Sequence, residues 1–331
     1  MSFSHILLNW FRENGRELPW RGTKDPYAIW LSEIILQQTQ VKQGWEYWER
    51  FMRRWPTVEA LADASEDEVL REWQGLGYYS RARNLHTAAQ QIVALGHFPD
   101  TLDDIKKLKG VGDYTAAAIG SIAFGLPAAV VDGNVYRVLS RYYGISTPIN
   151  TTQGKKEFQA LAQSLLPSLD REGQGAGLYN QAIMDFGAIQ CTPSSPNCQQ
   201  CPLQDTCTAF CDGRVAELPV KQKTLKVKER RLTYVYIRCQ GMVAIHRRPS
   251  GDIWQGLYEP WLTDEVPCDA VLLRQNVKHV LTHRVLYADF YLLEIGEKPV
   301  LPPDYFWIPE ADIDNYAVPR LIEILLETLH K

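Results

Sequence analysis

Four of the seven cysteines fall in one short segment, "CTPSSPNCQQCPLQDTC", from Cys191 to Cys207. They are separated by six, two and five residues, so only Cys198 and Cys201 form the close pair that zinc sites usually contain. A compact loop of four thiolates also suits an iron–sulfur cluster. The spacing alone leaves both metals open. Disulfides are the weaker interpretation, because the N-terminus predicts a first helix and no export signal, which implies a reducing cytoplasm.

Two carboxylates are candidates for acid–base chemistry. Glu33, in "WLSEIILQQTQV", shares a helical face with apolar residues such as Ile29 and Leu36, and such a setting raises the pKa of a carboxyl. The alternative is a buried glutamate paired with an arginine. Asp132, in "AAVVDGNVYRVLSR", stands between an apolar run and a predicted helix. It suits a helix N-cap, and a cap beside a pocket can still present its carboxylate there.

A glycine-rich turn joins two predicted helices in "LKGVGDYTAAA", residues 108–118. Gly110 and Gly112 allow a tight turn, and the free backbone N–H groups of the next helix can bind a phosphate. The alternative is a plain corner between two helices.

The chain reads as two domains of different texture. Residues 1–212 predict helices almost throughout, with Asp25 and Pro26 starting one helix and Thr101 and Asp104 spaced as a capping box. Residues 213–231 form a basic linker. Residues 232–331 alternate as strands do and close with an amphipathic helix, so we expect a smaller α+β domain.

Composition sets broad limits on function. The 331 residues are 45% hydrophobic and 22% charged, which is ordinary for a globular protein, and no run is long and apolar enough for a membrane span. The net charge of −4 argues weakly against nucleic acid, although residues 214–231 hold seven basic side chains against two acidic ones. A solvated linker explains that charge equally well. We expect a cytoplasmic protein with no membrane partner.

The motifs together resemble the endonuclease III and MutY DNA glycosylases. The cysteine spacing resembles their [4Fe–4S] loop, and "LKGVGDYTAAA" resembles their helix–hairpin–helix. The resemblance implies an all-α helix–hairpin–helix glycosylase domain with a [4Fe–4S] cluster, followed by an α+β Nudix-like domain. The implied cluster ligands are Cys191, Cys198, Cys201 and Cys207.

The resemblance also implies roles for single residues. Glu33 matches the acid that protonates adenine, and Asp132 matches the carboxylate that stabilises the sugar cation, with Tyr114 and Asn134 hydrogen-bonded beside them. Tyr114 stands where the lyase members carry a lysine, so no Schiff base is expected. The implied DNA contacts are Arg21, Gln38, Thr39, Gly77, Tyr78, Gly110, Gly112 and Arg141. Surface or loop packing is the alternative for each of the DNA-contacting side chains.

The C-terminal domain resembles MutT, a Nudix hydrolase, but lacks the acidic REUxEE part of the Nudix motif after Gly256. We therefore expect it to bind 8-oxoguanine and not to hydrolyse nucleotides. Thr282 and His283 match the family's reading loop, where Leu281 replaces the usual aromatic residue and leaves open what supports that loop. A surface histidine without a role is the alternative for His283.

The function implied is a monofunctional adenine DNA glycosylase of base excision repair. Its partner would be double-stranded DNA containing adenine opposite 8-oxoguanine or guanine. The resemblance thus also implies a monomer that is associated with the nucleoid. Three rivals stay open: a glycosylase/lyase acting on oxidised pyrimidines, a nucleotide hydrolase, and a catalytically silent iron–sulfur protein that binds DNA.

Overall fold

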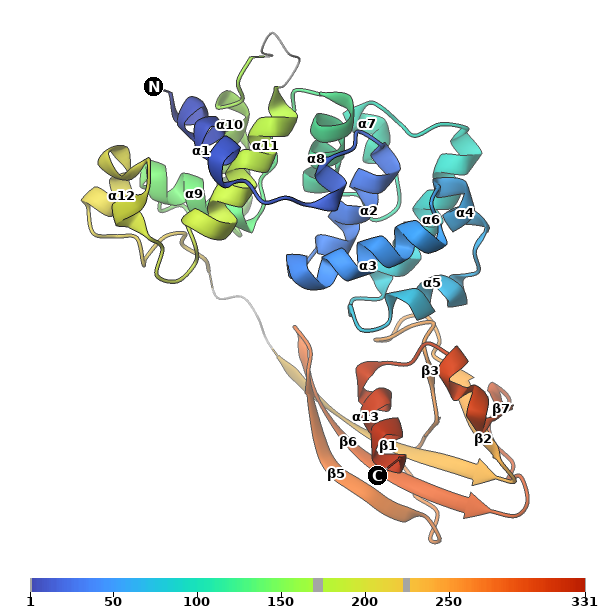
Figure 1. The fold of residues 1–331 in the computed structure, drawn as a ribbon. Coiled ribbons are helices and arrows are strands. Elements are labelled where there is room, and N and C mark those ends of the chain that lie inside the picture. Colours follow the sequence, from blue (N-terminus) through green and yellow to red (C-terminus); the bar gives the residue numbers. More distant parts are fainter. Residues whose placement is uncertain (1, 169–174, 223–226, 331) are drawn as a thin grey trace. The chain divides into compact units, whose positions relative to one another are not determined.

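A computed structural model describes residues 2–168, 175–222 and 227–330 of the chain (Figure 1). The chain forms two compact units. The first contains Met1–Ala62 and Thr87–Lys223, and the second contains Asp63–His86 and Thr224–Lys331. No helix in the described ranges has the length and apolar character needed to cross a membrane.

The first unit is helical in its described residues, as the sequence predicts. Its helices lie next to one another around an apolar core to which α1, α8, α9 and α11 contribute. The elements are α1 (Phe3–Asn14), η1 (Pro19–Arg21), α2 (Pro26–Leu36), α3 (Val41–Arg54), α4 (Val58–Asp63), α6 (Ser80–Leu95), α7 (Leu102–Ile105), α8 (Asp113–Phe124), α9 (Gly133–Tyr143), α10 (Thr152–Ser164), α11 (Ala176–Asp185), η2 (Phe186–Gln190), η3 (Cys198–Gln200), η4 (Gln204–Thr206) and α12 (Thr208–Cys211).

The predicted helix starts are confirmed in local detail. The Asp25 carboxylate accepts a hydrogen bond from the Tyr27 N–H at 2.9 Å, and Pro26 occupies the first turn of α2. The Thr101 hydroxyl likewise accepts a bond from the Asp104 N–H at the start of α7. These local signals fix where α2 begins, and α2 carries Glu33.

The second unit is a mixed sheet with α5 (Glu66–Trp73) and α13 (Arg320–Leu329). The parallel pair β1 and β6 is central in the order β3–β2–β1–β6–β5, and β4 and β7 pair with β1 and β2. Leu321, Ile322 and Leu325 of α13 pack on one face of the sheet (Figure 1). The strands are β1 (Lys228–Cys239), β2 (Met242–Arg247), β3 (Tyr258–Glu259), β4 (Trp261–Leu262), β5 (Val271–Val280), β6 (Arg284–Ile295) and β7 (Tyr305–Pro309). A short η5 (Glu310–Asn315) precedes α13.

Two boundaries differ from the sequence expectation. Strand β1 begins at Lys228, inside the expected linker, because residues 228–231 pair with β6. Part of that linker, residues 223–226, lies outside the described residues. Residues 63–86 group with the sheet and not with the other helices.

Candidate active site and cysteine loop

An open cavity of about 770 Å³ lies in the first unit between the start of α9, the end of α2 and the segment around η1. This volume is typical of small-ligand sites. Seven of the site residues expected from the sequence line it: Glu33, Tyr114, Asp132, Asn134, Arg21, Gln38 and Thr39. The structure therefore brings the two candidate carboxyls and their expected neighbours into one place.

Glu33 has the environment of a general acid. It is only 8% exposed, and the Tyr114 hydroxyl donates to its Oε2 at 3.0 Å. The pKa of Glu33 is raised to about 7, chiefly by burial and in part by the charge of Asp132, although the Tyr114 hydrogen bond and Arg21 act in the opposite direction. Glu33 is thus substantially protonated near neutrality.

Asp132 caps α9, as the sequence predicts, and still lines the cavity. Its Oδ1 accepts the Val135 N–H at 2.8 Å, and its Oδ2 accepts the Asn134 side-chain amide at 2.7 Å. Burial raises the pKa of Asp132, and these hydrogen bonds counteract the rise by favouring the charged form. The helix N-terminus holds the carboxylate in one orientation.

Tyr114 lies at the start of α8, directly after the glycine turn. Its hydroxyl contacts both Glu33 and the sulfur of Met184, at 3.0 and 3.3 Å. Burial and the neighbouring carboxyls raise the pKa of the phenol well above 10, so it stays protonated and can only donate to an ionised Glu33. The side chain carries no amine.

Arg16 and Arg21 line the cavity and pair with the buried Asp185; sequence reasoning named Arg21 but missed Arg16 and Asp185. The Arg21 guanidinium donates two hydrogen bonds to Asp185 at 2.7 and 2.8 Å, and Arg16 binds the same carboxylate through Nε at 2.9 Å. Burial alone would raise the pKa of Asp185, but the hydrogen bonds from Arg21 and Arg16 outweigh it and lower the pKa. The repeated arginines of "GRELPWR" are the only sequence signal for this group.

Arg137, also missed, connects the cavity with the cysteine loop. Its guanidinium donates to the Asn134 side-chain oxygen at 2.8 Å, to the Gly187 carbonyl at 2.6 Å and to the Cys191 carbonyl at 2.7 Å. Gly187 passes so close to α9 that an added Cβ would lie 2.6 Å from the Asn134 Cβ. The partner of Asp132 is therefore held by the segment that leads into the cysteines.

Arg141 has a different role from the expected DNA contact. It is 3% exposed, and its guanidinium binds the carbonyls of Thr192, Pro193 and Leu218 and the sulfur of Cys191. Buried donors satisfied in this way are not free to bind phosphate. Arg141 holds the cysteine loop against α9.

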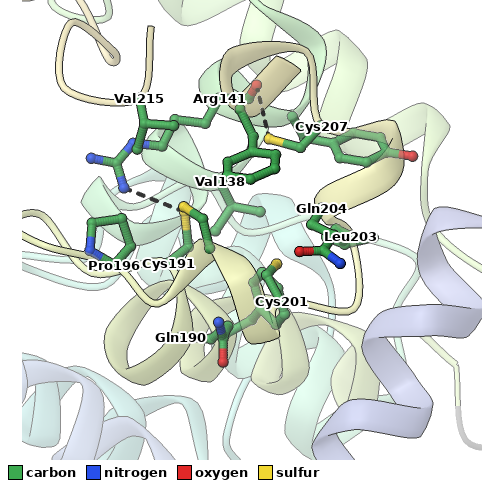
Figure 2. A pocket seen from close by; sticks show the side chains of 14 residues that line it. Val138, Arg141, Gln190, Cys191, Pro196, Cys201, Leu203, Gln204, Cys207 and Val215 are labelled. Atoms are coloured by element: carbon green, nitrogen blue, oxygen red, sulfur yellow. Dashed lines mark hydrogen bonds between the residues drawn. The ribbon is translucent and has the colours of Figure 1, made fainter. Parts of the chain in front are cut away.

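The four clustered cysteines surround a second cavity, whose lining includes Val138, Phe186 and Leu203 (Figure 2). None of the four forms a disulfide, and all are partly buried. Burial raises the pKa of Cys201 to about 11, and it also raises the pKa of Cys198 and Cys207. Thiolates in this setting need cations in place of their protons, and the irons of a cluster supply these. The set of donors fits an iron–sulfur cluster.

The glycine turn has the expected geometry. Gly110 has φ of +79°, a conformation that favours glycine, and Gly112 is the extended N-cap of α8. No side chain caps α8, so its first backbone N–H groups are not used by a cap. Such a helix start can receive a phosphate.

Strained backbone marks the residues expected to probe the duplex. Gln38, beside Thr39, has φ of +58°, and Tyr78, beside Gly77, has φ of +47°. Positive φ is uncommon for side chains of this size and recurs at functional sites. Tyr78 is also 47% exposed.

In the second unit, the expected reading residues lie in the turn between β5 and β6. Thr282 and His283 are exposed, and the Thr282 and Tyr78 hydroxyls form a hydrogen bond. Leu281 packs against the apolar core of this unit, which supplies the support that the sequence left open.

Glu259 follows the glycine of the Nudix-like segment but is 1% exposed. Its carboxylate accepts hydrogen bonds from Tyr234 at 2.8 Å, from His246 at 2.9 Å and from Arg248. These partners occupy the oxygens that a metal ion would need.

Three family models match the chain. Residues 31–168 match the HhH-GPD superfamily of base excision DNA repair proteins, residues 191–207 match the iron–sulfur binding domain of endonuclease III, and residues 233–328 match the NUDIX domain. The predicted fold class is confirmed by these matches.

Curated relatives carry the name adenine DNA glycosylase. The protein from Buchnera aphidicola of Schizaphis graminum is 36% identical over 77% of this chain and 73% of its own length. The one from Buchnera aphidicola of Baizongia pistaciae is 33% identical over 86% of this chain and 84% of its own. The human protein is 43% identical over 63% of this chain and 39% of its own.

Solved structures resemble the helical part. A thermostable thymine-DNA glycosylase superposes with a TM-score of 0.57 and 31% identity, covering 63% of this chain and 95% of its own. A trapped endonuclease III–DNA covalent intermediate gives 0.54 and 22% identity, covering 63% of this chain and 94% of its own. The second likeness concerns the fold alone.

Proposed function

The chain belongs to the adenine DNA glycosylase family, and we propose that it removes adenine paired with 8-oxoguanine or guanine in double-stranded DNA. It binds DNA and hydrolyses the N-glycosidic bond of adenine as a step of base excision repair. The proposal concerns the choice of mispair and the residues that carry out the reaction.

The observation that carries the proposed residue roles is that the buried Glu33, whose pKa is raised to about 7, lines the same cavity as Asp132. Cleavage of a nucleoside requires an acid for the leaving base and an anion for the oxocarbenium-like sugar. Two carboxyls whose environments differ in this way can divide those tasks.

The proposed steps follow from these two groups. Glu33 donates its proton to adenine N7 while the C1′–N9 bond breaks and its electron pair stays on the base. The Asp132 carboxylate stabilises the sugar cation. The ionised Glu33 then takes a proton from water as the water oxygen bonds to C1′, which leaves an abasic site. Tyr114 and Asn134 are positioning residues in this scheme, because each donates a hydrogen bond to one of the carboxylates.

Strand cleavage is not part of the proposed reaction. A lyase needs an amine that attacks the sugar, and Tyr114 offers a phenol at the position in question. The enzyme is therefore proposed to be monofunctional, leaving an abasic site that breaks only in alkali.

The adenine must leave the stack before it reaches Glu33. We propose that the hairpin with Gly110 and Gly112 holds a phosphate, and that Gln38, Thr39, Gly77 and Tyr78 probe the duplex. Arg21 is proposed to shape the base pocket together with Asp185. The two hydrogen bonds from Arg21 to the Asp185 carboxylate support a fixed position for the Arg21 guanidinium.

Thr282 and His283 are proposed to read the base opposite the adenine. The exposure of their turn and the contact between Thr282 and Tyr78 support this role. The partial burial of Leu281 supports it further, since the turn has an apolar anchor.

The cofactor is a [4Fe–4S] cluster, because residues 191–207 match the iron–sulfur binding domain of endonuclease III. We propose Cys191, Cys198, Cys201 and Cys207 as its ligands. These four thiolates would hold the cluster and thereby tie the loop together. Arg141 and Arg137 then attach this loop to α9.

We propose a catalytic part made of residues 1–62 and 87–212 and a reading part made of residues 63–86 and 228–331, with the linker between residues 212 and 228. All proposed catalytic groups belong to one chain, which supports action as a monomer. The DNA substrate supports action at the nucleoid in the cytoplasm.

A single-turnover reaction tests this function. The substrate is a duplex with one adenine opposite 8-oxoguanine, and the products are free adenine and alkali-dependent strand breaks. We expect adenine release with breaks only after alkali. Glu33→Gln and Asp132→Asn should abolish release while binding to the duplex is retained. Breaks without alkali would contradict the monofunctional mechanism.

A further inference from the structure

The loop that carries Tyr78 is part of the sheet-containing unit. Residues 63–86 lie between two helical stretches of the first unit in the sequence, but they pack with residues 224–331. They comprise α5, the loop with Gly75, Gly77 and Tyr78, and the start of α6. The contacts that hold this segment therefore determine where Tyr78 stands relative to the turn with Thr282.

The first turn of α5 is fastened by Arg247 at the end of β2. The guanidinium Nη2 lies 2.8 Å from Glu66 Oε1 and 3.0 Å from Asp67 Oδ1. The Tyr258 hydroxyl donates to the other oxygen of Asp67 at 3.0 Å. Acidic side chains at a helix N-terminus are favourable in themselves, so these two can bind a cation without straining α5.

The two ends of the loop are held by the same unit. Before the loop, the Gln74 side chain accepts the Val318 N–H at 3.3 Å and donates to Glu323 at 2.6 Å. After the loop, Arg83 donates to the Gln255 carbonyl at 2.6 Å. Each attachment lies within a few residues of Tyr78.

The loop itself is stiffened between these attachments. The Trp73 indole N–H donates to the Gly77 carbonyl at 3.0 Å, and the Arg81 guanidinium donates to the carbonyls of Leu76 and Gly77 at 3.3 Å. The loop thus transmits a displacement of α5 to Tyr78, whose hydroxyl bonds to Thr282.

Arg247 contacts both α5 and the turn at Gly256. Its Nε donates to the Gly256 carbonyl at 3.2 Å, next to Gln255, which receives Arg83. The packing there is close, since a Cβ on Gly256 would lie 3.2 Å from the Leu70 side chain of α5. One side chain thereby fixes both α5 and the turn that holds the far end of the loop.

We infer that Arg247 is a positioning residue for reading the base opposite the adenine: by fastening α5, it sets Tyr78 against Thr282. This inference rests on the proposed function and adds a specificity determinant that touches no DNA. The acidic pair Glu66 and Asp67 is its counterpart on α5. The rate with 8-oxoguanine, relative to guanine, depends on this contact.

The test is a charge exchange in the full, cluster-loaded chain. Single-turnover adenine release is measured opposite 8-oxoguanine and opposite guanine for wild type, Arg247→Glu, Glu66→Arg, and the two changes combined. The ion pair is partly exposed, so we expect each single change to lower the 8-oxoguanine-to-guanine rate ratio by about fivefold. The combined exchange should restore most of that ratio. Arg274→Glu, a charge reversal at an exposed position of β5, is the matched control and should leave the ratio unchanged.

Hydrogen exchange of the loop amides gives a second readout. Arg247→Glu should speed exchange in residues 75–79 without changing α2, and the combined exchange should reverse this. A wild-type ratio with unchanged loop exchange in Arg247→Glu would overturn the inference. Absence of adenine release from the wild type would instead overturn the proposed function, and the loop exchange would still decide the role of Arg247.

Discussion

At the scale of single residues, the site separates two carboxyls by their surroundings. Glu33 sits among apolar side chains of α2 with a phenol as its partner, whereas Asp132 sits at a helix start with two N–H donors. Burial raises the pKa of both carboxyls, to about 7 for Glu33, and at Asp132 the N–H donors counteract part of the rise. The fold thus gives the charged form of Asp132 more hydrogen-bond support than it gives the charged form of Glu33.

The raised pKa of Glu33 has a consequence for stability. Its pKa is about 7 in the folded chain against an ordinary value of 4.5, so between these values the folded chain binds the extra proton. Stability is therefore lost as pH rises from about 4.5 to about 7, by about 3 kcal/mol in total. Glu33→Gln should lack this loss. Its free energy of unfolding, measured with denaturant, should therefore rise relative to that of wild type between pH 5 and pH 8. Glu46→Gln, on the exposed face of α3, should track wild type, and equal pH profiles for all three would contradict the burial of the charge.

The same group sets the pH dependence of catalysis. The reaction needs protonated Glu33, so the rate of adenine release should fall as pH rises above about 7. Tyr114→Phe removes a hydrogen bond that lowers the pKa of Glu33, and its falling limb should lie at higher pH. Single-turnover rates from pH 5.5 to 9 measure both curves. A limb at the same pH in both proteins would show that the Tyr114 hydroxyl does not act on Glu33.

At the scale of elements, α9 connects the cavity with the cysteine loop. Asp132 caps its first turn, and Arg137 and Arg141 reach from its later turns to the loop. Gly187 lets the loop approach the first turn closely.

Gly187→Ala should therefore displace Asn134 and, with it, Asp132. We expect a fall in adenine release of about tenfold or more, because small misplacements of reacting groups are costly. Gly22→Ala, where an added Cβ meets nothing within 4 Å, is the control and should react like wild type. If Gly187→Ala reacted at the wild-type rate with unchanged cluster content, the added methyl group would displace the loop and leave α9 in place.

We expect Arg141 to stabilise the cysteine loop and Lys109 to bind DNA. Arg141→Ala should lose cluster on purification, since its guanidinium binds the loop, yet keep the salt dependence of DNA binding. Lys109→Ala, in the exposed hairpin, should keep the cluster and reduce the slope of log K against log salt by about 1. Absorbance near 400 nm and titrations at several salt concentrations measure these effects. A reduced slope in Arg141→Ala would return it to the DNA contacts.

What could be predicted from the sequence was local or carried by a specific motif. Asp25, Thr101 and Asp132 cap helices because their partners lie two or three residues away. The role of Arg141 was not predictable, since its partners lie about fifty residues further along the chain. Arg16 was missed for the same reason, because its partner Asp185 is distant in the sequence.

At the scale of the whole molecule, the second unit matches the NUDIX domain, but the sequence after Gly256 lacks the acidic part of the Nudix motif. Its glutamate in the Nudix-like segment, Glu259, is buried and bound by three side chains. We expect no turnover of nucleoside triphosphates, including 8-oxo-dGTP, with Mg²⁺ or Mn²⁺. Phosphate or pyrophosphate release is the measurement, with wild type and Glu259→Gln compared. Turnover in the wild type that Glu259→Gln abolishes would contradict this.

The grouping of residues 63–86 with the sheet was beyond sequence reasoning. The pattern of α5 is that of an ordinary amphipathic helix, and its acidic start reads as a capping box, which Ser65 and Glu68 indeed form. Nothing local marks Glu66 and Asp67 as partners of an arginine about 180 residues later. Only the three-dimensional packing reveals which unit the helix belongs to.

That arrangement also imposes an order on biosynthesis. The ribosome completes α5 about 155 residues before the first strand of its sheet begins, a delay of roughly 10 s at ordinary elongation rates. During this time the sheet that later packs against Leu70 and holds the loop with Tyr78 has not been synthesised. Three consecutive acidic residues, Glu66 to Glu68, keep the nascent helix soluble until the last part of the chain has been synthesised.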